Sequence, residues 1–220
     1  GYTPESIRLF AEKVGVAKRD NVIDLSLLEW CLREDLNKRA NRYMTVLNPV
    51  KLVITNWEDG KVEYFDAPLN PENPDGPKRK VAFTKELYIE REDFMEDAPK
   101  KYFRLKPDGE VRLKYSYIIK CEEVIKDEDG NVIEIRCTYD PTSKPGAGPW
   151  RSVKGTIHWV SIEHSKEIEV RVFDRLFTEP YMGSIPEGED YKNYLNPNSL
   201  DVKTGYAEED LLKDSFEIGV

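Results

Sequence analysis

Residues 102–120 read YFRLKPDGEVRLKYSYIIK and decide the fold class. A turn sequence, KPDG at 106–109, separates a short segment from a longer one, as in a β-hairpin. Across residues 111–119, hydrophobic and polar side chains alternate, apart from Ile118 on the polar side. A period of two is typical of a strand with one buried face. The stretch therefore predicts a β-hairpin with a strand on either side of its turn.

Similar signals recur on both sides of this stretch. Turn sequences at 58–60 and 127–131 predict a hairpin between residues 51–57 and 61–65 and a strand at 132–139. Further strands are predicted at 80–91, 153–161 and 168–177, and loops at 66–79, 141–152 and most of 181–200. Many short strands at intervals of about ten residues indicate barrels or a sandwich rather than βαβ units. The length of this β region favours two small barrels over one large one.

The first 45 residues predict helices instead. Thr3 and Pro4 fit the N-cap and the first turn of a helix that Gly15 would end. Residues 26–29, Ser-Leu-Leu-Glu, have the pattern of a capping box, which makes Ser26 the expected N-cap of a second helix. The predicted fold class is therefore mainly β, with an N-terminal helical segment followed by two small β-barrels.

The composition describes a folded acidic protein. The 220 residues include 33 Lys and Arg against 42 Asp and Glu, for a net charge of −9, and 11% are aromatic, which supports a real core. The apolar runs are too short to cross a bilayer, and the start of the chain lacks the pattern of a signal peptide. Three scattered cysteines without CxxC spacing favour reduced thiols and a cytoplasmic location.

The common catalytic signatures are missing from the sequence. It contains no GxxxxGK[ST], no GxGxxG after a predicted strand and no GxSxG. His158 and His164 lie six residues apart without a neighbouring cysteine, so we expect no metal site and interpret His158 as a structural or surface residue. No catalytic residue is predicted in this chain.

One segment departs from the acidic composition. Residues 100–114 contain six cations against two acids, a charge of +4, which leaves −13 for the rest of the chain. The cations are Lys100, Lys101, Arg104, Lys106, Arg112 and Lys114. Charge that is segregated in this way attracts an anion locally while the remaining surface repels it.

The spacing of these cations suggests RNA. Arg112 and Lys114 alternate with apolar residues, which places both on one face of the predicted strand, and Arg104 would share that face across the hairpin. Cations beside the aromatic residues at 102 and 103 are the mixture that holds single-stranded RNA. Tyrosines 115 and 117 fall on the apolar side and are expected in the core. A basic strand face is also often only a solvated surface, and the pattern leaves both interpretations open.

Several blocks of the sequence together carry a family resemblance. They occur in the same order over essentially the whole chain, at residues 1–8, 23–37, 48–53, 109–114, 153–161 and 173–177. In these blocks the chain resembles the glutaminyl-tRNA synthetases, from the point where their catalytic half ends. The resemblance implies a helical segment on the inside of the tRNA L and two barrels that grip the anticodon loop.

The resemblance also implies domain boundaries and separate domains for tRNA binding and for catalysis. Residues 1–45 would form the helical segment, 46–95 plus about 168–220 a proximal barrel, and about 96–167 a distal barrel. The ATP-binding domain, which uses ATP with Mg²⁺ to join glutamine to its tRNA, would precede Gly1. The chain would then bind glutamine tRNA and contact its own catalytic domain as part of a cytoplasmic monomer, without itself aminoacylating. The family places further base-reading residues beyond Val220, which implies an incomplete, frayed last barrel.

Individual site residues follow from the same resemblance. The residues that match family positions contacting the anticodon stem and loop are Lys18, Asn37, Arg42, Lys101, Arg104, Arg112 and Lys114. Two positions depart from the family: Phe103 stands where some relatives have a base-contacting lysine, and Lys114 where they have arginine, which loses a bidentate contact.

Two other functions are compatible with the sequence. The corresponding region of an archaeal-type glutamyl-tRNA synthetase shares these barrels, and only the residues upstream of this region would distinguish the two amino acids. A protein-interaction β module, with an acidic surface that docks a basic partner, is the second alternative. In that case Arg112 and Lys114 would not matter for function.

Overall fold

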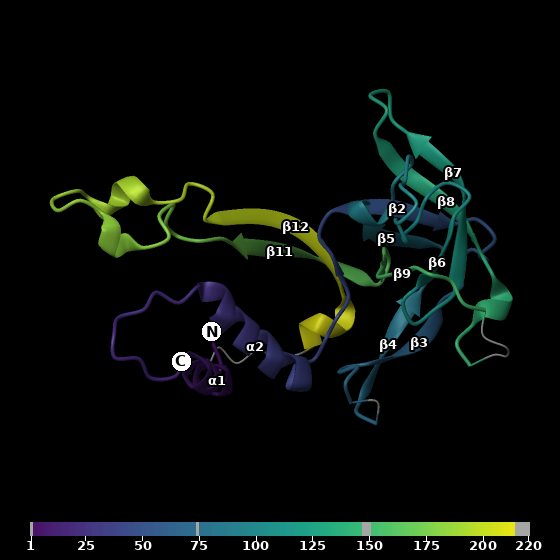
Figure 1. Cartoon of the computed structure of the whole chain (residues 1–220). Coiled ribbons are helices and arrows are strands. Elements are labelled where there is room, and N and C mark those ends of the chain that lie inside the picture. Colours follow the sequence, from purple (N-terminus) through teal and green to yellow (C-terminus); the bar gives the residue numbers. More distant parts are fainter. Residues whose placement is uncertain (1, 74, 147–150, 214–220) are drawn as a thin grey trace.

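The computed structural model describes residues 2–73, 75–146 and 151–213 (Figure 1). Two helices are followed by strands, so the predicted mainly β class with an N-terminal helical segment is confirmed. The helices are α1 (Pro4–Val14) and α2 (Leu25–Arg39). The strands are β1 (Thr45–Val46), β2 (Pro49–Ile54), β3 (Glu63–Pro68), β4 (Lys78–Phe83), β5 (Glu86–Glu90), β6 (Glu110–Leu113), β7 (Ile118–Lys126), β8 (Val132–Tyr139), β9 (Thr156–Ile157), β10 (Val160–Ser161), β11 (Ser165–Phe173) and β12 (Leu200–Glu208). Short 3₁₀ turns occur at η1 (Arg91–Asp93), η2 (Pro141–Ser143), η3 (Met182–Ser184), η4 (Tyr191–Tyr194) and η5 (Glu209–Lys213).

The two helices begin at different kinds of cap. Thr3 caps α1, and Gly15 ends it with a φ of 69°, as the sequence predicts. The expected N-cap of α2, Ser26, is wrong by two positions. Asp24 caps this helix and accepts a hydrogen bond from the backbone N–H of Ser26 at 2.8 Å. Asp is as good a cap as Ser, and its negative charge is also favourable at a helix N-terminus.

The helices pack against each other in an antiparallel pair. The Thr3 hydroxyl donates to Asp35 at 2.6 Å, and Arg39 pairs with both Asp35 at 2.6 Å and Glu5 at 3.3 Å. These contacts fix the start of α1 against the end of α2. Cys31 is fully buried in α2.

Seven strands form the main sheet, in the order β10-β5-β2-β8-β7-β6-β9. Its two edge strands, β9 and β10, are separated in sequence only by His158 and Trp159. Because the three steps from Ile157 to Val160 span at most about 11 Å, the edges must come close together and the sheet must curl. Trp159 is completely buried at this seam. The result is a barrel-like body, seen on the right of Figure 1.

This sheet draws strands from both predicted barrels. β2 and β5 fall in the predicted proximal barrel, whereas β6 to β10 fall in the predicted distal one, and β2 pairs in parallel with β8. The boundaries proposed for two separate barrels therefore stay a prediction.

Aromatic side chains fill the core of this body. The β3–β4 hairpin contributes Phe65 and Phe83, which pack with Trp57 and Tyr117 in edge-to-face contacts at centroid distances of 4.8–6.0 Å. Such contacts add to the free energy gained from burying the rings. Tyr117 is 5% exposed, so its predicted place in the core is confirmed.

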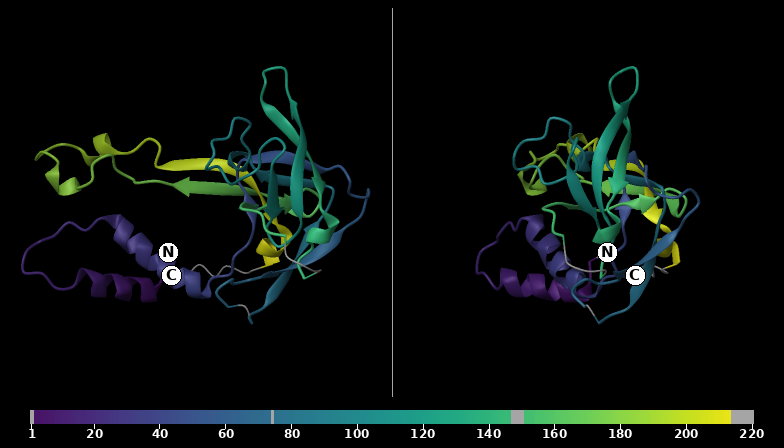
Figure 2. Two further views of the ribbon diagram at one scale, coloured as in Figure 1. Left: turned by 45° about the vertical axis from the view of Figure 1, so that its right-hand side comes forward. Right: turned by 90° about the vertical axis from the view of Figure 1, so that its right-hand side faces the viewer.

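The last two long strands form an arm. β11 and β12 pair antiparallel over nine residues, and β1 adds to the base of β12. Figures 1 and 2 show the arm projecting from the body above the helical pair. Near its tip, Arg175 forms an ion pair of 3.7 Å with Asp24 at the start of α2. The arm and the helices thus meet at their far ends.

Three predicted strand arrangements are wrong. Residues 51–57 and 61–65 do not pair with each other: β2 pairs with β5 and β8, and β3 pairs with β4. Residues 102–105 are not a strand, because only Leu105 makes an isolated bridge, to Phe94. The long strand expected from Glu110 is interrupted at 114–117, where Tyr115 has a φ of 67°, so β6 and β7 are themselves the hairpin.

Other predicted elements are placed with small changes. The 80–91 and 153–161 segments are each split into two strands, and the turn at 127–131 joins β7 to β8 as expected. The frayed end that the resemblance implies concerns residues 214–220, which lie outside the described residues. Within the described ranges, no helix is long and apolar enough to span a membrane.

Candidate RNA-binding site

Three segments of the body lie side by side and bring the predicted barrel residues into one region. The backbone N–H of Arg112 donates to the Gly155 carbonyl, and that of Lys114 to the Ile157 carbonyl, each at 2.9 Å. A Cβ at Gly155 would lie 2.1 Å from the carbonyl oxygen of Phe103, so only glycine permits this approach. The segments 103–105, 112–114 and 154–158 therefore share one surface, which we call the seam surface.

Arg104 lies on the seam surface with an acidic partner. Its Nη1 forms a short ion pair with the carboxylate of Asp93, whose side chain is only 5% exposed. The Arg104 side chain itself is 52% exposed. An arginine has five N–H donors, so a guanidinium that is anchored at one edge still presents donors to a ligand.

The Arg112 guanidinium is hydrogen-bonded to backbone carbonyls. It donates to the carbonyl oxygens of Ser116 at 2.8 Å, Ser143 at 3.0 Å and Arg151 at 3.2 Å. Burial lowers its pKa from the ordinary value. The expectation that Arg104 and Arg112 project together from two strands of one hairpin is wrong, because that hairpin does not form and each side chain follows its own partners.

The two lysines of this region differ in their surroundings. Lys114 sits in the turn after β6, with its Nζ 5.3 Å from the centre of the Tyr115 ring. Lys101 is exposed in the turn that precedes residue 103. Lys154, which the sequence did not single out, lies 5.3 Å from the Phe103 ring, and that ring is 50% exposed. The seam surface thus combines cations with an open aromatic face, as sites for unstacked bases do.

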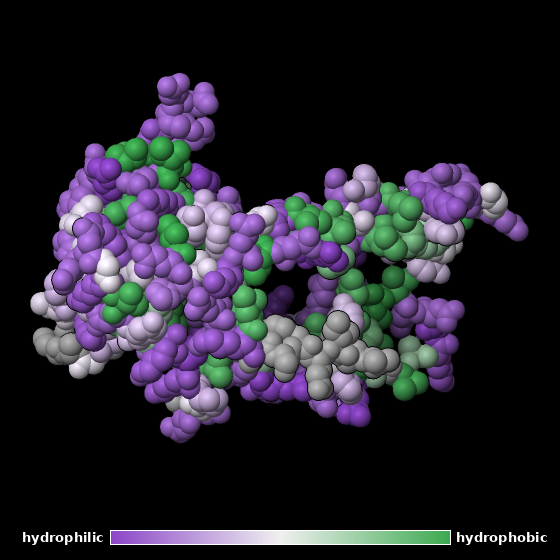
Figure 3. Space-filling model, turned by 180° about the vertical axis from the view of Figure 1, so that it is seen from behind, coloured by the Kyte–Doolittle hydropathy of each residue, from purple (hydrophilic) through white to green (hydrophobic). Residues whose placement is uncertain are grey.

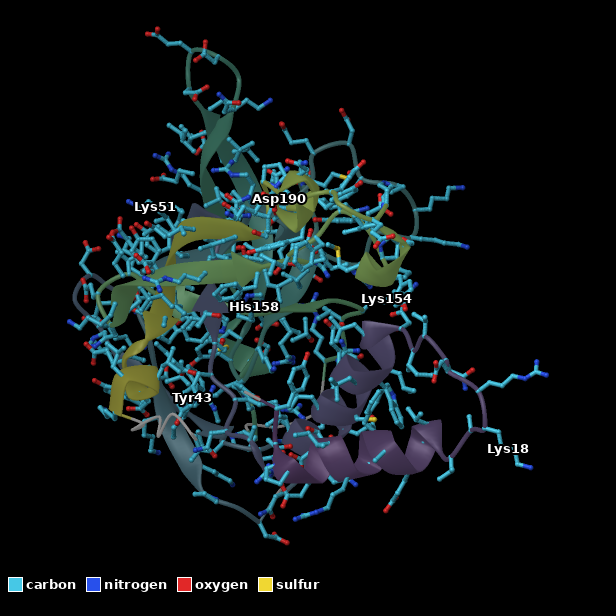
Figure 4. The ribbon with its side chains drawn as sticks, turned by 90° about the vertical axis from the view of Figure 1, so that its left-hand side faces the viewer. Lys18, Tyr43, Lys51, Lys154, His158 and Asp190 are labelled. Carbon is cyan, nitrogen blue, oxygen red and sulfur yellow. The ribbon has the colours of Figure 1, made fainter. Side chains whose placement is uncertain are left out.

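A second group forms at the end of α2. Arg42 donates to the backbone carbonyl of Asn37 at 3.1 Å and to its side-chain oxygen at 3.2 Å. Asn70 donates to the same carbonyl at 3.2 Å, and Glu72 pairs with Arg42 at 3.5 Å. Two predicted residues, Asn37 and Arg42, are therefore in contact. Lys18 belongs to neither group: it extends from the loop between the helices (Figure 4).

The structure adds residues that sequence reasoning missed. Asp93 is buried in η1 and is the partner of Arg104, and His158 lies 3.9 Å from it. The position of His158 beside Trp159, in one of the blocks that carry the resemblance, was the only signal in the sequence.

A hollow of about 540 Å³ between β4 and the end of β12 is lined in part by Tyr43, Tyr64 and Lys80.

The described residues contain no group of three or more acidic, histidine or cysteine side chains placed to hold a metal ion. The seam surface offers charged donors, an exposed ring and fixed backbone. The arrangement fits an anionic, partly unstacked polymer such as an RNA loop.

Two family models match this chain. Both are described as tRNA synthetases class I (E and Q), anti-codon binding domain, and they cover residues 40–140 and 156–217. The chain is similar to the glutamine–tRNA ligases of Nitrosomonas europaea (52% identical over 213 residues), Clostridium kluyveri (49% over 214) and Rhodopirellula baltica (51% over 209). These matches cover 94–96% of the chain but only 35–38% of each ligase.

The names of these relatives favour the glutaminyl over the glutamyl alternative. Since the two family models cover most of the chain, the resemblance drawn from the sequence is confirmed. The chain belongs to the class I (E and Q) tRNA synthetases, as the anticodon-binding region of the glutaminyl branch.

Proposed function

We propose that this chain recognises the anticodon stem-loop of glutamine tRNA for a glutamine–tRNA ligase. Its binding residues are Lys18, Asn37, Arg42, Lys101, Arg104, Arg112 and Lys114. ATP-dependent glutaminylation, with ATP and Mg²⁺, belongs to a catalytic domain in the rest of that ligase, which acts as a cytoplasmic monomer. The observation that carries the proposal is the gathering of cations and an exposed ring on the seam surface of an otherwise acidic protein.

The residues divide into different roles. Lys18 and Lys101 are exposed point charges, so they suit phosphates. Arg104 is held at one edge and half exposed, which suits a base edge. The Asn37–Arg42 contact presents a guanidinium that is 40% exposed beside the end of α2. Arg112 supports RNA binding by fixing the backbone around β6.

A salt series tests the proposal. The affinity of the 220-residue chain for the anticodon stem-loop of glutamine tRNA should fall more than about tenfold between roughly 50 and 200 mM salt, because three or more phosphate contacts release that many counterions. Filter binding measures it, and a stem-loop of equal size with a changed anticodon is the control. A folded chain that binds neither RNA at low salt would contradict the proposal.

We also propose that the rest of the ligase covers the arm and the helical pair. Exposed apolar side chains are numerous there and appear as green areas in Figure 3. They include Val14, Val22, Leu25, Phe173 and Leu176, of which Phe173 is 74% exposed. Apolar surface of this extent normally marks an interface. The relatives are more than twice as long as their matched regions, so ample chain exists to form it.

Hydrogen exchange tests this contact. Amide exchange around residues 172–176 should slow at least about tenfold in the full ligase relative to the 220-residue chain, because burial and ordering suppress local opening. Exchange around Ile133, which is 49% exposed on β8, is the matched control and should not change. Equal exchange at residues 172–176 in both proteins would contradict the contact.

A further inference from the structure

Four ionisable side chains form a connected network at the seam surface. His158 lies with Nε2 3.6 Å from Glu90 and with Nδ1 3.9 Å from Asp93, and Asp93 pairs with Arg104. They come from four places in the chain: the end of β5, the turn η1, the irregular segment before β6 that carries Arg104, and the two-residue link at which the sheet edges meet. Figure 4 shows His158 among the packed side chains of the body, in contrast to Lys18.

Hydrogen bonds with the backbone hold both acidic residues of this network. Glu90 accepts hydrogen bonds from the N–H groups of Leu47 at 2.7 Å and Asn48 at 2.9 Å. The backbone of Asp93 is also engaged, since its carbonyl accepts from the N–H of Leu105 at 3.0 Å. Asp93 thus holds Arg104 in two places: its carbonyl binds the backbone of the next residue, Leu105, and its carboxylate binds the guanidinium.

The charges of the network balance only when His158 is protonated. Glu90 and Asp93 are then matched by Arg104 and the imidazolium. Hydrogen bonding to Glu90 raises the pKa of His158, whereas burial raises the pKa of Asp93. The titratable groups that face His158 are Glu90 and Asp93, with Tyr102 and Arg104 beyond Asp93. With neutral His158, the guanidinium alone offsets two carboxylates.

We propose that Asp93 is a positioning residue that aims Arg104 at the RNA, and that protonated His158 tunes the strength of this site by neutralising the carboxylates behind it. This inference rests on the proposed function. Asp93 does not contact RNA in this arrangement, because its side chain is almost fully buried behind Arg104. The network makes RNA affinity depend on a single proton on His158, whose ring lies beside the two carboxylates.

The first test separates positioning from charge. Asp93→Asn removes one negative charge, so simple electrostatics predicts tighter RNA binding. Loss of positioning instead predicts binding that is at least about fivefold weaker. The matched control is Asp59→Asn, which also removes one negative charge, from an exposed ion pair with Lys85. This control should bind RNA as tightly as the parent chain or more tightly. Asp93→Asn that binds as tightly as Asp59→Asn would overturn the proposal.

A second variant covers the case in which Asp93→Asn fails to fold. Arg104→Lys keeps the positive charge and leaves Asp93 with a cationic partner, but it removes the planar set of N–H donors of the guanidinium. We expect an affinity at least about fivefold lower, with the circular dichroism spectrum unchanged. Unchanged affinity in a folded Arg104→Lys would show that the aim of the guanidinium does not matter, and would also overturn the proposal.

The pH profile tests His158. Because its pKa is raised, the imidazolium and its effect persist below about pH 6.5 and are lost as the pH rises through the raised value. RNA affinity should fall about three- to tenfold as the pH rises through that interval, because His158 loses its positive charge. His158→Gln should bind at the level of the high-pH limit without this transition. His164→Gln, the only other histidine substitution available, should keep it.

The failure of each proposal has a distinct signature. If the parent chain binds no RNA at any salt, the proposed function fails, while NMR titration still reports on the network: Asp93→Asn should lower the pKa of His158. If RNA binds but its pH profile is the same in the parent chain and in His158→Gln, only the role of His158 is refuted.

Discussion

Arg79→Ala is expected to lower the free energy of unfolding by about 3–5 kcal/mol, the cost of removing one partner from a buried ion pair. The side chains of Arg79 and Glu208 are 4% and 7% exposed, with Nη2 and Nε at 2.7 and 2.8 Å from the same carboxylate oxygen. That oxygen also accepts the backbone N–H of Met44 at 2.6 Å, and Arg79 donates to the Pro68 carbonyl at 2.9 Å. Without Arg79, the charge of Glu208 remains buried with one donor.

Urea unfolding measures this effect, with a neighbour as the control. Lys80 follows Arg79 in β4 and pairs with Asp66 at 2.7 Å, but both side chains are more than half exposed. Lys80→Ala should leave the stability nearly unchanged, because exposed pairs are weak. Combining Arg79→Met with Glu208→Leu should recover part of the loss, since no charge then stays buried. Equal losses for Arg79→Ala and Lys80→Ala would contradict the prediction.

This ion pair also shows what sequence patterns cannot supply. Arg79 lies in a stretch predicted as the end of a loop, and Glu208 is one acid among many in the last 40 residues. They meet because β12 runs back along the arm to the base of the body, 129 residues away in the chain. Nothing local in either segment specifies that partner.

Features set by neighbouring residues were predictable. Thr3, Pro4 and Gly15 define α1 through backbone geometry that each residue type favours by itself. The turn between β7 and β8 is likewise local: the Asp127 carboxylate accepts from the backbone N–H of Asn131 at 2.7 Å. Such signals need no knowledge of the rest of the fold.

Strand pairing was less predictable for a physical reason. Glu58-Asp59-Gly60 is a genuine turn, yet the strands on either side of it pair elsewhere, because closing the curled sheet places β8 beside β2. Alternation reveals that a strand has a buried face but not which strand lies beside it. At residue 115 the positive φ of a tyrosine interrupts the strand, and Ile118, which broke the alternation, was the one hint.

The residue types of the candidate site were predicted, but their contacts were not. The cations are present in the segment at 100–114, which lies within a matched anticodon-binding domain, and their individual roles stay a prediction. The partners Asp93 and His158 come from a 3₁₀ turn and a two-residue link, which have no periodicity to read. The contrast is greatest at Arg112, which the resemblance assigns to RNA and which donates hydrogen bonds to three backbone carbonyls.

Arg112→Ala is therefore expected to lower the free energy of unfolding by about 2–4 kcal/mol, because carbonyls paired with a cation lose bonds of roughly 1.5–3 kcal/mol each and only some regain water. Those of Ser116 and Ser143 lie in partly buried surroundings, whereas the Arg151 carbonyl is exposed. Arg112→Lys keeps the charge but cannot present a planar fork to three acceptors, so most of the loss should remain. Urea unfolding of both variants measures it, and stability within about 0.5 kcal/mol of the parent chain would contradict this account.

The same two variants decide how Arg112 serves RNA binding. If Arg112 contacts a phosphate, Arg112→Ala should reduce the slope of log affinity against log salt by about 0.7–0.9, and Arg112→Lys should restore it. If it acts by fixing the carbonyls around β6, both variants should weaken binding equally and leave the slope unchanged. Since the guanidinium is committed to three carbonyls, we expect the second result, measured at a temperature at which both variants are fully folded. A slope restored by lysine would instead place Arg112 against the RNA backbone.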